Sequence, residues 1–356
     1  MKDRIKRLGE KIKGESLDLL LVTTPTNLRY LCGYTGSNGI LLISEDKSIF
    51  ITDFRYKEQV KKEVKDAEIK IAQRELFSTL TEIDWLKEKR IKVGFESKNL
   101  SFKLYEKLKT LLPQVLWIPT EDLVESISVT KDEEEIKKIK KAADISAKAF
   151  EKILPLFKPG VKEQDLSAEL EYHIKKNGGT GSAFEPIVAS GVRSAMPHAR
   201  ASSKRFQRGE FVTLDFGAFY EGYVCDITRT VVLGKATPRQ KKIYNLVLKA
   251  QTKAIKNVRS GMKGFELDKV ARDVINNAGF KDYFGHGLGH GIGLLVHDSP
   301  GINTKSQEVL KPGMVITIEP GVYLPGWGGV RIEDDILITR NGCKILTNIK
   351  RELFEL

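Results

Sequence analysis

The chain has 356 residues, more than the roughly 250–300 at which a single hydrophobic core usually stops growing, so we expect two domains. Hydrophobic residues make up 41% and charged residues 30%, which excludes disordered and collagen-like chains. The net charge of +12 is spread along the chain, and the basic stretch 131–141 also holds four acidic residues, so we expect no nucleic-acid partner.

The sequence also lacks the usual signs of membrane insertion and secretion. No apolar run approaches the ~20 residues of a membrane helix. The basic segment 1–14 is not followed by the apolar stretch of a secretory signal. Cys32, Cys225 and Cys343 are too few for a disulfide framework and too far apart for a zinc-binding pair. We therefore expect a cytoplasmic protein with no membrane partner.

Residues 1–122 alternate short apolar segments with amphipathic ones, which predicts an α/β domain. The expected strands are residues 17–23, 39–44, 48–52, 68–72, 92–95 and 116–119. The expected helices are residues 3–13, 55–65, 80–89 and 102–112. Glu45, Asp46 and Lys47 separate two apolar strands and predict a hairpin turn.

A second domain is expected over residues 130–356, with helices and strands in separate runs. Thr130 and Glu133 have the spacing of a capping box, which would begin a long helix that ends near Leu154. Further helices are expected over residues 164–176, 238–259 and 264–278, and strands within 211–232 and 314–339. This order predicts an α+β layer fold.

Four acidic residues interrupt the apolar, strand-like sequence of the second domain: Asp215, Asp226, Glu319 and Glu333. A hairpin folded about Tyr220 and Glu221 would place the first two directly across from each other, and folding about Gly326 would pair the other two. Like charges in such positions destabilise a sheet, and a divalent cation between them removes the repulsion. The alternative is that these residues cap turns or pair with lysines, although buried acids are rare unless paired or metal-bound.

The acidic set indicates the kind of metal site. Four carboxylates are balanced by two divalent ions rather than one, and carboxylate and imidazole ligands without thiolate suit Mn²⁺, Co²⁺, Fe²⁺ or Zn²⁺. Two such ions can activate water at neutral pH and polarise a scissile carbonyl. The residues alone therefore predict a dinuclear metallohydrolase and leave its substrate open.

Three of the five histidines lie in the glycine-rich segment 284–298, at His286, His290 and His297. Along one extended strand, His290 and His297 would face opposite sides, because seven positions separate them. The glycines imply close packing of the backbone near the site. The segment lacks the GxGxxG spacing of a phosphate-binding loop.

The segment from His286 to Asp298, HGLGHGIGLLVHD, resembles the signature of the proline-specific metallopeptidases, the prolidase and aminopeptidase P group of the pita-bread superfamily. Residues 214–217, 226–230, 318–321 and 329–334 resemble other motifs of that group. Residues 34–39 and 53–56 resemble, more loosely, the creatinase-type N-terminal domain. The resemblance implies a creatinase-like α/β domain before a pita-bread catalytic domain, and an exopeptidase that cleaves the Xaa-Pro bond of proline-containing peptides.

The resemblance also implies roles for particular residues. Five would hold two metal ions, Mn²⁺ or Co²⁺ first and Zn²⁺ or Fe²⁺ as alternatives: Asp215, Asp226, His290, Glu319 and Glu333. Asp226 and Glu333 would bridge the ions, Asp215 would bind one of them, and His290 and Glu319 the other. Glu319 would also shuttle a proton.

Five further roles on the substrate side follow from the same resemblance. His198 and His297 would face the substrate, and His297 would stabilise the tetrahedral intermediate by hydrogen bonding. Arg331 would orient the substrate or neighbouring acids, while Phe184 and His286 would line the substrate pocket. Members of the group commonly form homodimers.

One departure from the group bears on substrate length. Prolidases that act on dipeptides often carry an arginine four residues after the position of His297, where this chain has Gly301. The missing clamp for a free carboxylate favours an Xaa-Pro aminopeptidase acting on longer peptides. An Xaa-Pro dipeptidase is the alternative, since Arg193, Arg200 or an N-terminal arginine could replace the clamp. A more remote alternative is a non-catalytic peptide- or protein-binding module, although such relatives usually lose metal ligands.

Overall fold

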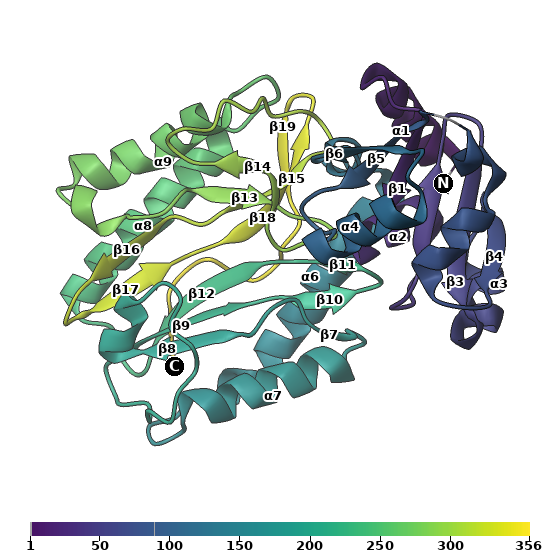
Figure 1. Ribbon diagram of the computed structural model, residues 1–356. Coiled ribbons are helices and arrows are strands. Elements are labelled where there is room, and N and C mark those ends of the chain that lie inside the picture. The colour runs from purple at the N-terminus through teal and green to yellow at the C-terminus, as the bar shows by residue number, and fades with distance from the viewer. Residues whose placement is uncertain (1, 89) are drawn as a thin grey trace. The chain divides into compact units, whose positions relative to one another are not determined.

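The computed structural model describes residues 2–88 and 90–356, which form two units that meet between Ser128 and Val129 (Figure 1). Within these residues, no helix combines the length and the apolar character needed to cross a membrane. The first unit is built on a six-stranded sheet with the order β4-β3-β2-β1-β5-β6. The β1–β2 and β2–β3 pairs are antiparallel, whereas the other neighbours are parallel.

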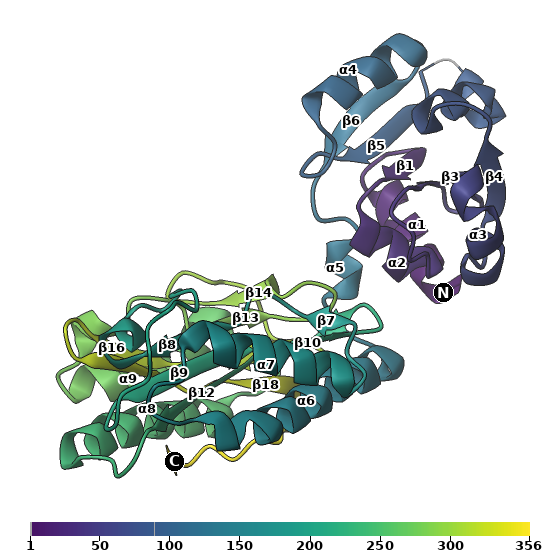
Figure 2. The ribbon, with the colours of Figure 1, turned by 90° about the horizontal axis from the view of Figure 1, so that it is seen from below.

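The strands of the first unit are β1 (Leu19–Val22), β2 (Ile40–Ile43), β3 (Ser48–Asp53), β4 (Glu68–Ala72), β5 (Lys92–Glu96) and β6 (Leu116–Thr120). Its helices are α1 (Lys2–Gly14), α2 (Pro25–Cys32), α3 (Lys57–Glu63), α4 (Phe102–Leu111) and α5 (Glu125–Ser128), with 3₁₀ turns η1 (Phe54–Tyr56), η2 (Leu76–Glu82) and η3 (Asp84–Lys87). Figure 2 shows α4 on one side of the strands and α1 and α2 on the other. Consecutive strand residues such as Leu20 and Leu21, which point to opposite faces, are both fully buried, because both faces of the sheet are covered.

All six strands expected in this unit are confirmed, and so is the hairpin, in which Ile43 pairs with Ser48. The helix expected over residues 80–89 is wrong. Ile83 has an extended backbone (φ −89°, ψ 115°) that splits the segment into η2 and η3, and its last residue, Lys89, lies outside the described residues. Helix α2 was not expected, although Pro25 at its first turn and Gly33 as its left-handed C-cap are ordinary end signals.

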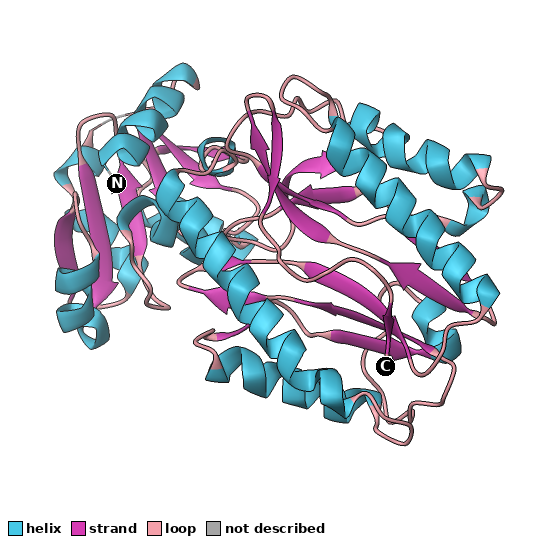
Figure 3. Ribbon diagram, turned by 180° about the vertical axis from the view of Figure 1, so that it is seen from behind, coloured by secondary structure: helices cyan, strands magenta, loops and turns pink. Residues whose placement is uncertain are grey.

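The second unit consists of two halves, each with a pair of helices packed on a sheet whose neighbouring strands are antiparallel, except that β20 pairs parallel with β12 in the first half. The first half contains α6 (Glu133–Ile153), α7 (Glu163–Lys176), β8 (Ile187–Ser190), β9 (Phe211–Phe216), β12 (Ile227–Val232) and β20 (Phe354–Glu355), with the strand order β20-β12-β9-β8. The second half contains α8 (Pro238–Asn257), α9 (Gly264–Asn277), β13 (Gly289–Gly291), β14 (Asp298–Ile302), β15 (Val315–Ile318), β18 (Asp334–Thr339) and β19 (Gly342–Ile345), with the order β14-β13-β15-β18-β19. In Figure 3 the long helices of this unit lie in front of the strands, so they cover one side of them.

Smaller elements complete the second unit. A three-stranded sheet joins β7 (Gly181–Ser182), β10 (Ala218–Tyr220) and β11 (Tyr223–Val224), and a hairpin joins β16 (Gly321–Leu324) to β17 (Gly328–Arg331). The 3₁₀ turns are η4 (Leu154–Leu156), η5 (Gly191–Ala195) and η6 (Lys281–Tyr283). The expected helices begin and end within two residues of α6, α7, α8 and α9.

The capping box of α6 differs from the expected one. Asp132, not Thr130, is the N-cap, and its carboxylate accepts a hydrogen bond from the backbone N–H of Glu135. The Glu135 carboxylate in turn accepts from the N–H of Asp132. The consecutive acids of this segment allow two capping boxes, Thr130 with Glu133 and Asp132 with Glu135, and the helix forms the second.

Side-chain alternation in the sheets decides which residues face away from the helices. Leu214 and Phe216 of β9 lie in the core with Phe150 of α6, so Asp215 between them points to the opposite face. Likewise Ile316 and Ile318 of β15 pack in the core of the second half. The next position in that alternation, Glu319, therefore emerges on the same open side as Thr317.

Candidate active site

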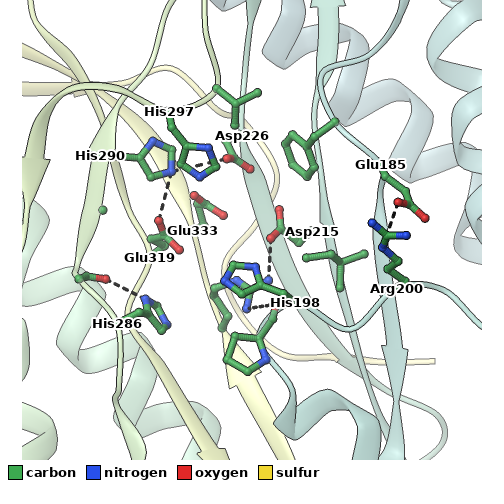
Figure 4. A pocket seen from close by; sticks show the side chains of 17 residues that line it. Glu185, His198, Arg200, Asp215, Asp226, His286, His290, His297, Glu319 and Glu333 are labelled. Carbon is green, nitrogen blue, oxygen red and sulfur yellow. Dashed lines mark hydrogen bonds and ion pairs between the residues drawn. The ribbon is translucent and has the colours of Figure 1, made fainter. Parts of the chain in front are cut away.

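A cavity of about 430 Å³ lies in the second unit, and all ten residues that the sequence assigns to the site line it. These residues are Phe184, His198, Asp215, Asp226, His286, His290, His297, Glu319, Arg331 and Glu333. Figure 4 shows the acidic side chains gathered between the two clustered histidines and His198. The cavity combines residues from both halves of the unit, from segments up to about 150 positions apart.

The first acidic pair is diagonal across the sheet rather than directly opposed. Asp215 pairs with Thr228, and Ile227 pairs with Phe216, so Asp226 stands two positions from the partner of Asp215 and on the same face. The expected register is wrong because the turn comprises Glu221 and Gly222, which both have positive φ (46° and 91°).

Close approach of the backbones on this hairpin requires glycine at one position. A Cβ atom at Gly217 would overlap the carbonyl oxygen of Cys225 on the facing segment. Gly217 directly follows the strand that carries Asp215, and Cys225 directly precedes Asp226. The absence of a side chain therefore lets the two carboxylate-bearing segments come together.

The second acidic pair has the register that the sequence predicts. Ile318 pairs with Asp334 in the β15–β18 ladder, and Gly321 pairs with Arg331 in the β16–β17 ladder. Both ladders keep the same register, which places Glu319 across from Glu333 in the gap between them. This prediction is confirmed.

His290 and His297 face the same cavity, with ring centroids 4.5 Å apart. They do not share a strand: His290 lies in β13, the chain then reverses, and His297 comes directly before β14, which pairs antiparallel with β13. The expectation of opposite faces therefore does not apply. The Nδ1 atom of His290 lies 3.0 Å from the carbonyl oxygen of Gly291, which places the proton on Nδ1 and leaves Nε2 as an electron-pair donor.

The His290 Nε2 atom points into the acidic cluster. It lies 3.4 Å from Glu319 Oε1 and 3.9 Å from Asp226 Oδ2. Donor atoms of Asp226, His290 and Glu333 lie within 4.8 Å of one another, so these three residues alone could hold a metal ion. Burial lowers the pKa of His290, which keeps the imidazole in the neutral form that binds metals.

The carboxylates of this cluster are poorly stabilised as anions by the protein itself. Burial, followed by repulsion from neighbouring carboxylates, raises the pKa of Asp226 and of Glu333 well above the ordinary value. Burial likewise raises the pKa of Glu319 to about 8. Positive charge in addition to that of Arg331, which lies beside these carboxylates, is thus needed to keep all of them ionised at neutral pH.

Three carboxylate oxygens of the cluster lack donors. Asp215 Oδ1, Asp226 Oδ1 and Glu333 Oε1 are buried and have no hydrogen-bond partner among the described residues. Their residues are otherwise well held: Thr228 donates to Glu333 Oε2 at 2.6 Å, and Arg331 contacts Asp215 Oδ2 at 2.6 Å. Buried acceptors without donors are rare, and divalent cations would satisfy all three. The residues present therefore fit a metal site.

Arg331 is buried and fully engaged. Its guanidinium donates to Asp215 Oδ2, to the Tyr323 hydroxyl at 2.8 Å and to Thr228 Oγ1 at 3.0 Å. Burial opposes its charge, but Tyr323, Asp215 and the neighbouring glutamates outweigh burial and hold its pKa well above the ordinary value. Arg331 is therefore a fixed positive charge beside the acidic cluster.

Sequence reasoning missed several residues that hold this site. The Tyr323 hydroxyl connects Arg331 to His286, whose Nε2 lies 2.9 Å away, and burial lowers the pKa of His286 to about 4. Thr317 accepts from the backbone N–H of His290 at 3.1 Å and contacts Glu319 at 3.3 Å. Side-chain alternation along β15 and β16 could have indicated them, because residues 317 and 323 lie an even number of positions from residue 319 and therefore fall on the same face as Glu319.

Asp335 is a further buried acid that the sequence analysis did not single out. Asp335 Oδ2 accepts a hydrogen bond of 3.1 Å from the backbone N–H of Asp226. Burial raises the pKa of Asp335 well above the ordinary value. It stands two residues after Glu333 along the same segment, so strand alternation could have indicated it. Asp335 fixes the backbone position of Asp226 from the other half of the unit.

Of Gly301 and the two arginines that could replace a clamp there, Arg193 and Arg200, one lines the cavity. Gly301 does not line the cavity, and its N–H donates to Glu308. Arg193 does not line it either, because its guanidinium bonds to the buried Glu163 and to the carbonyl oxygen of Arg200. Arg200 does line the cavity, as an ion pair with Glu185.

Residues 137–340 match the family described as "Metallopeptidase family M24", and residues 4–127 match the "Creatinase/Prolidase N-terminal domain". The chain is a member of metallopeptidase family M24. The expected fold, a creatinase-type domain followed by a pita-bread catalytic domain, is confirmed. As a member of this family, the chain is a metal-dependent hydrolase of peptide bonds.

Several relatives of this M24 peptidase span its whole length. It is 40% identical to the Xaa-Pro dipeptidase of Pyrococcus horikoshii, over 99% of both chains. Among solved structures, an Xaa-Pro dipeptidase from Bacillus anthracis is 43% identical with a TM-score of 0.96, covering 100% of this chain and 99% of that one. An X-Pro aminopeptidase from Thermotoga maritima is 38% identical with a TM-score of 0.92, covering 98% and 100%.

Proposed function

We propose that this M24 peptidase hydrolyses the Xaa-Pro bond at the N-terminus of peptides by means of two divalent metal ions. The observation that carries the proposal is the buried acidic cluster, in which three carboxylate oxygens lack donors. The specificity for proline is supported by the names of relatives that match over the full length, which include both Xaa-Pro dipeptidases and an X-Pro aminopeptidase.

Five residues would hold the ions: Asp215, Asp226, His290, Glu319 and Glu333. Asp226 and Glu333 would bridge both ions, and Mn²⁺ or Co²⁺ are the first expectation, with Zn²⁺ or Fe²⁺ suited to the same donors. When bound, the ions would supply Lewis-acid polarisation of the scissile carbonyl and lower the pKa of water. Arg331 would orient Asp215, and Glu319 would carry the proton between water and the leaving amine.

The substrate-side roles rest on the walls of the cavity. His198 and His297 lie on different sides of the acidic cluster (Figure 4). His297 would donate a hydrogen bond to the developing oxyanion, and His198 would contact the substrate from the other side. Phe184 and His286 would line the substrate pocket.

Substrate length separates the two forms of this proposal. The absence of an arginine at position 301 favours an Xaa-Pro aminopeptidase, which acts on longer peptides. One observation favours the second candidate, an Xaa-Pro dipeptidase: Arg200 lines the cavity and could take the place of the missing arginine. We further propose that residues 1–122 and 130–356 are separate domains, as chain length and the pattern of elements predict, and that the enzyme is cytoplasmic, as its few, scattered cysteines indicate. We also propose that it forms a homodimer, as members of the group that it resembles commonly do.

A direct assay tests the proposal. Metal-free protein is loaded with Mn²⁺, Co²⁺ or Zn²⁺, bound metal is counted, and cleavage is measured on an Xaa-Pro dipeptide, an Xaa-Pro-Xaa tripeptide and an Xaa-Ala-Xaa control. We expect two ions per chain and cleavage only before proline. A protein that retains no metal and cleaves no Xaa-Pro peptide would instead be the non-catalytic binding module of the same fold.

A further inference from the structure

One wall of the cavity carries an exposed ion pair that has no part in the acidic cluster. Arg200 Nε lies 3.4 Å from Glu185 Oε2, and their side chains are 83% and 62% exposed. Both residues line the cavity, and Figure 4 shows them on the side away from His290 and His297.

Arg200 is the available cation of this cavity. Among the described residues that line it, Arg200 and Arg331 are the two arginines, and no lysine lines it. Arg331 is buried and donates to Asp215, Tyr323 and Thr228, so it cannot release a donor without leaving one of these groups unpaired. The partner of Arg200 is instead exposed to water, which can solvate the Glu185 carboxylate once the pair opens.

The backbone that carries Arg200 is firmly held. Glu163 is fully buried and accepts hydrogen bonds from Arg193 Nε at 3.0 Å and from the Ser202 hydroxyl at 2.7 Å. The same Arg193 guanidinium donates to the carbonyl oxygen of Arg200 at 2.5 Å. A buried carboxylate thus fixes the segment on both sides of Arg200, while the Arg200 side chain stays in solvent at the cavity.

An exposed ion pair of this kind is worth only about 0–1 kcal/mol, so an incoming carboxylate can replace Glu185 on the guanidinium. An Xaa-Pro dipeptide brings such a carboxylate into a cavity already rich in acids, where an unpaired negative charge is strongly unfavourable. A guanidinium can bind a carboxylate through two parallel hydrogen bonds. A longer peptide has an amide at that position and needs no cation there.

We infer that Arg200 binds the C-terminal carboxylate of Xaa-Pro dipeptides and that Glu185 competes with the substrate for the same guanidinium. The inference rests on the proposed Xaa-Pro activity and specifies its substrate class. Arg200 admits dipeptides although position 301 is glycine, and Glu185 weakens their binding. The two members of one ion pair therefore have opposite effects on the same substrate.

The test compares three substrates on metal-loaded enzyme: an Xaa-Pro dipeptide, its C-terminal amide Xaa-Pro-NH₂, and an Xaa-Pro-Xaa tripeptide. Arg200→Ala should raise KM for the dipeptide about 10- to 100-fold, the loss expected for a charged hydrogen bond, with the amide nearly unchanged. Glu185→Gln should lower KM for the dipeptide and leave the amide unchanged. Arg200→Lys should restore part of the dipeptide affinity.

The comparison contains its own controls. Each variant is measured on both the carboxylate and the amide, so a loss of folded enzyme would affect the two equally. Arg205→Ala removes an exposed arginine that does not line the cavity, and it should change neither KM. Equal losses on dipeptide and amide in Arg200→Ala, or wild-type cleavage of the tripeptide alone, would overturn the inference. Failure of the wild type to cleave any of the three would overturn the proposed function itself.

Discussion

The buried acidic residues are the feature of this molecule with the sharpest functional consequence. Glu333 offers one oxygen to Thr228 and leaves the other without a donor. Glu333→Gln keeps the shape but replaces a charged oxygen with a poorer ligand. We expect loss of bound metal and a fall in kcat/KM of at least about 100-fold. Metal analysis and peptide assays measure both quantities.

The matched control is Glu308→Gln, which changes an exposed acid outside the cavity. It should retain two ions and normal turnover. Near-normal activity and metal content in Glu333→Gln would contradict the assignment of Glu333 as a bridging ligand.

His297 is expected to act on the substrate rather than on the metal. The centroid of its ring lies 4.5 Å from the centroid of the His290 ring on the cavity wall. Removal of one oriented donor to an oxyanion costs about 10²–10³-fold in turnover. His297→Ala should therefore show that loss in kcat with metal content unchanged, as measured by single-turnover kinetics and metal analysis. A variant that loses metal would make His297 a ligand instead.

Family motifs and unusual residues predicted the residues that line the site, but not those that support it. The carboxylates stood out because acids are unusual in apolar strands, and the histidines because they cluster. Tyr323 and Asp335 had only the weaker signal of strand alternation, because a tyrosine is ordinary in a strand and Asp335 stands beside two other acids. Their contacts with Arg331 and with the Asp226 backbone depend on the facing strands, which a single sequence does not show.

At the scale of elements, the two hairpins show where sequence reasoning succeeds and where it fails. The turn after Leu324 was placed correctly, so Glu319 and Glu333 were paired correctly. The turn at Glu221 and Gly222 was placed one residue early, which moved the pairing of Asp215 by two positions. A two-residue hairpin turn of type I′ needs positive φ at both central residues, and Gly222 suits the second position, so this turn chemistry favours the register that the structure has.

One ion pair ties the start of α6 to the segment that carries His297. Lys131 directly precedes the α6 cap, Asp298 directly follows His297, and their charged atoms are 3.1 Å apart with side chains 2% and 10% exposed. Lys131→Met would leave the Asp298 carboxylate buried without its partner. We expect a loss of about 3–5 kcal/mol in the free energy of unfolding, together with reduced turnover, while Lys131→Arg should retain most of both.

Denaturant unfolding and peptide assays measure these two effects. A matched control is Lys137→Met, which removes a lysine from an exposed pair with Glu134. That pair should contribute no more than about 1 kcal/mol. Equal effects of the two lysine substitutions would show that the buried pair has no special part in holding the His297 segment.

At the scale of the whole molecule, metal binding and folding are linked through the acidic cluster. The five proposed ligands come from both halves of the second unit, so ions held between them join segments far apart in the chain. An ion that binds only the folded state stabilises it by about 2.7 kcal/mol when the concentration of free ion is 100 times the dissociation constant. The metal-free protein must instead keep several acids together beside the guanidinium of Arg331, and the pKa of Glu319 stays raised in spite of that charge.

This linkage predicts a pH dependence of stability with a definite sign. Burial raises the pKa of Glu319 to about 8 in the metal-free fold, against an ordinary value of 4.5. The folded state then binds more protons than the unfolded state between these values, so its stability falls as pH rises through 8. His286 and His290, whose pKa values are lowered by burial, act in the opposite direction only below about 6.5. The free energy of unfolding of metal-free protein should therefore decrease between pH 6.5 and 8.5.

The same measurement on metal-loaded protein completes the test. Metal ions compete with protons for these carboxylates, so their stabilising effect should grow across the interval from pH 6.5 to 8.5. Urea unfolding of metal-free and Mn²⁺-loaded protein at both pH values gives the four free energies required. Glu319→Gln removes one of the titrating carboxylates of the cluster, and it should reduce the pH dependence of the metal-free protein, while Asp226 and Glu333 still contribute in the same direction. If metal-free stability were constant or rose over this interval in the wild type, the acidic cluster would not be the proton-binding group that its burial implies.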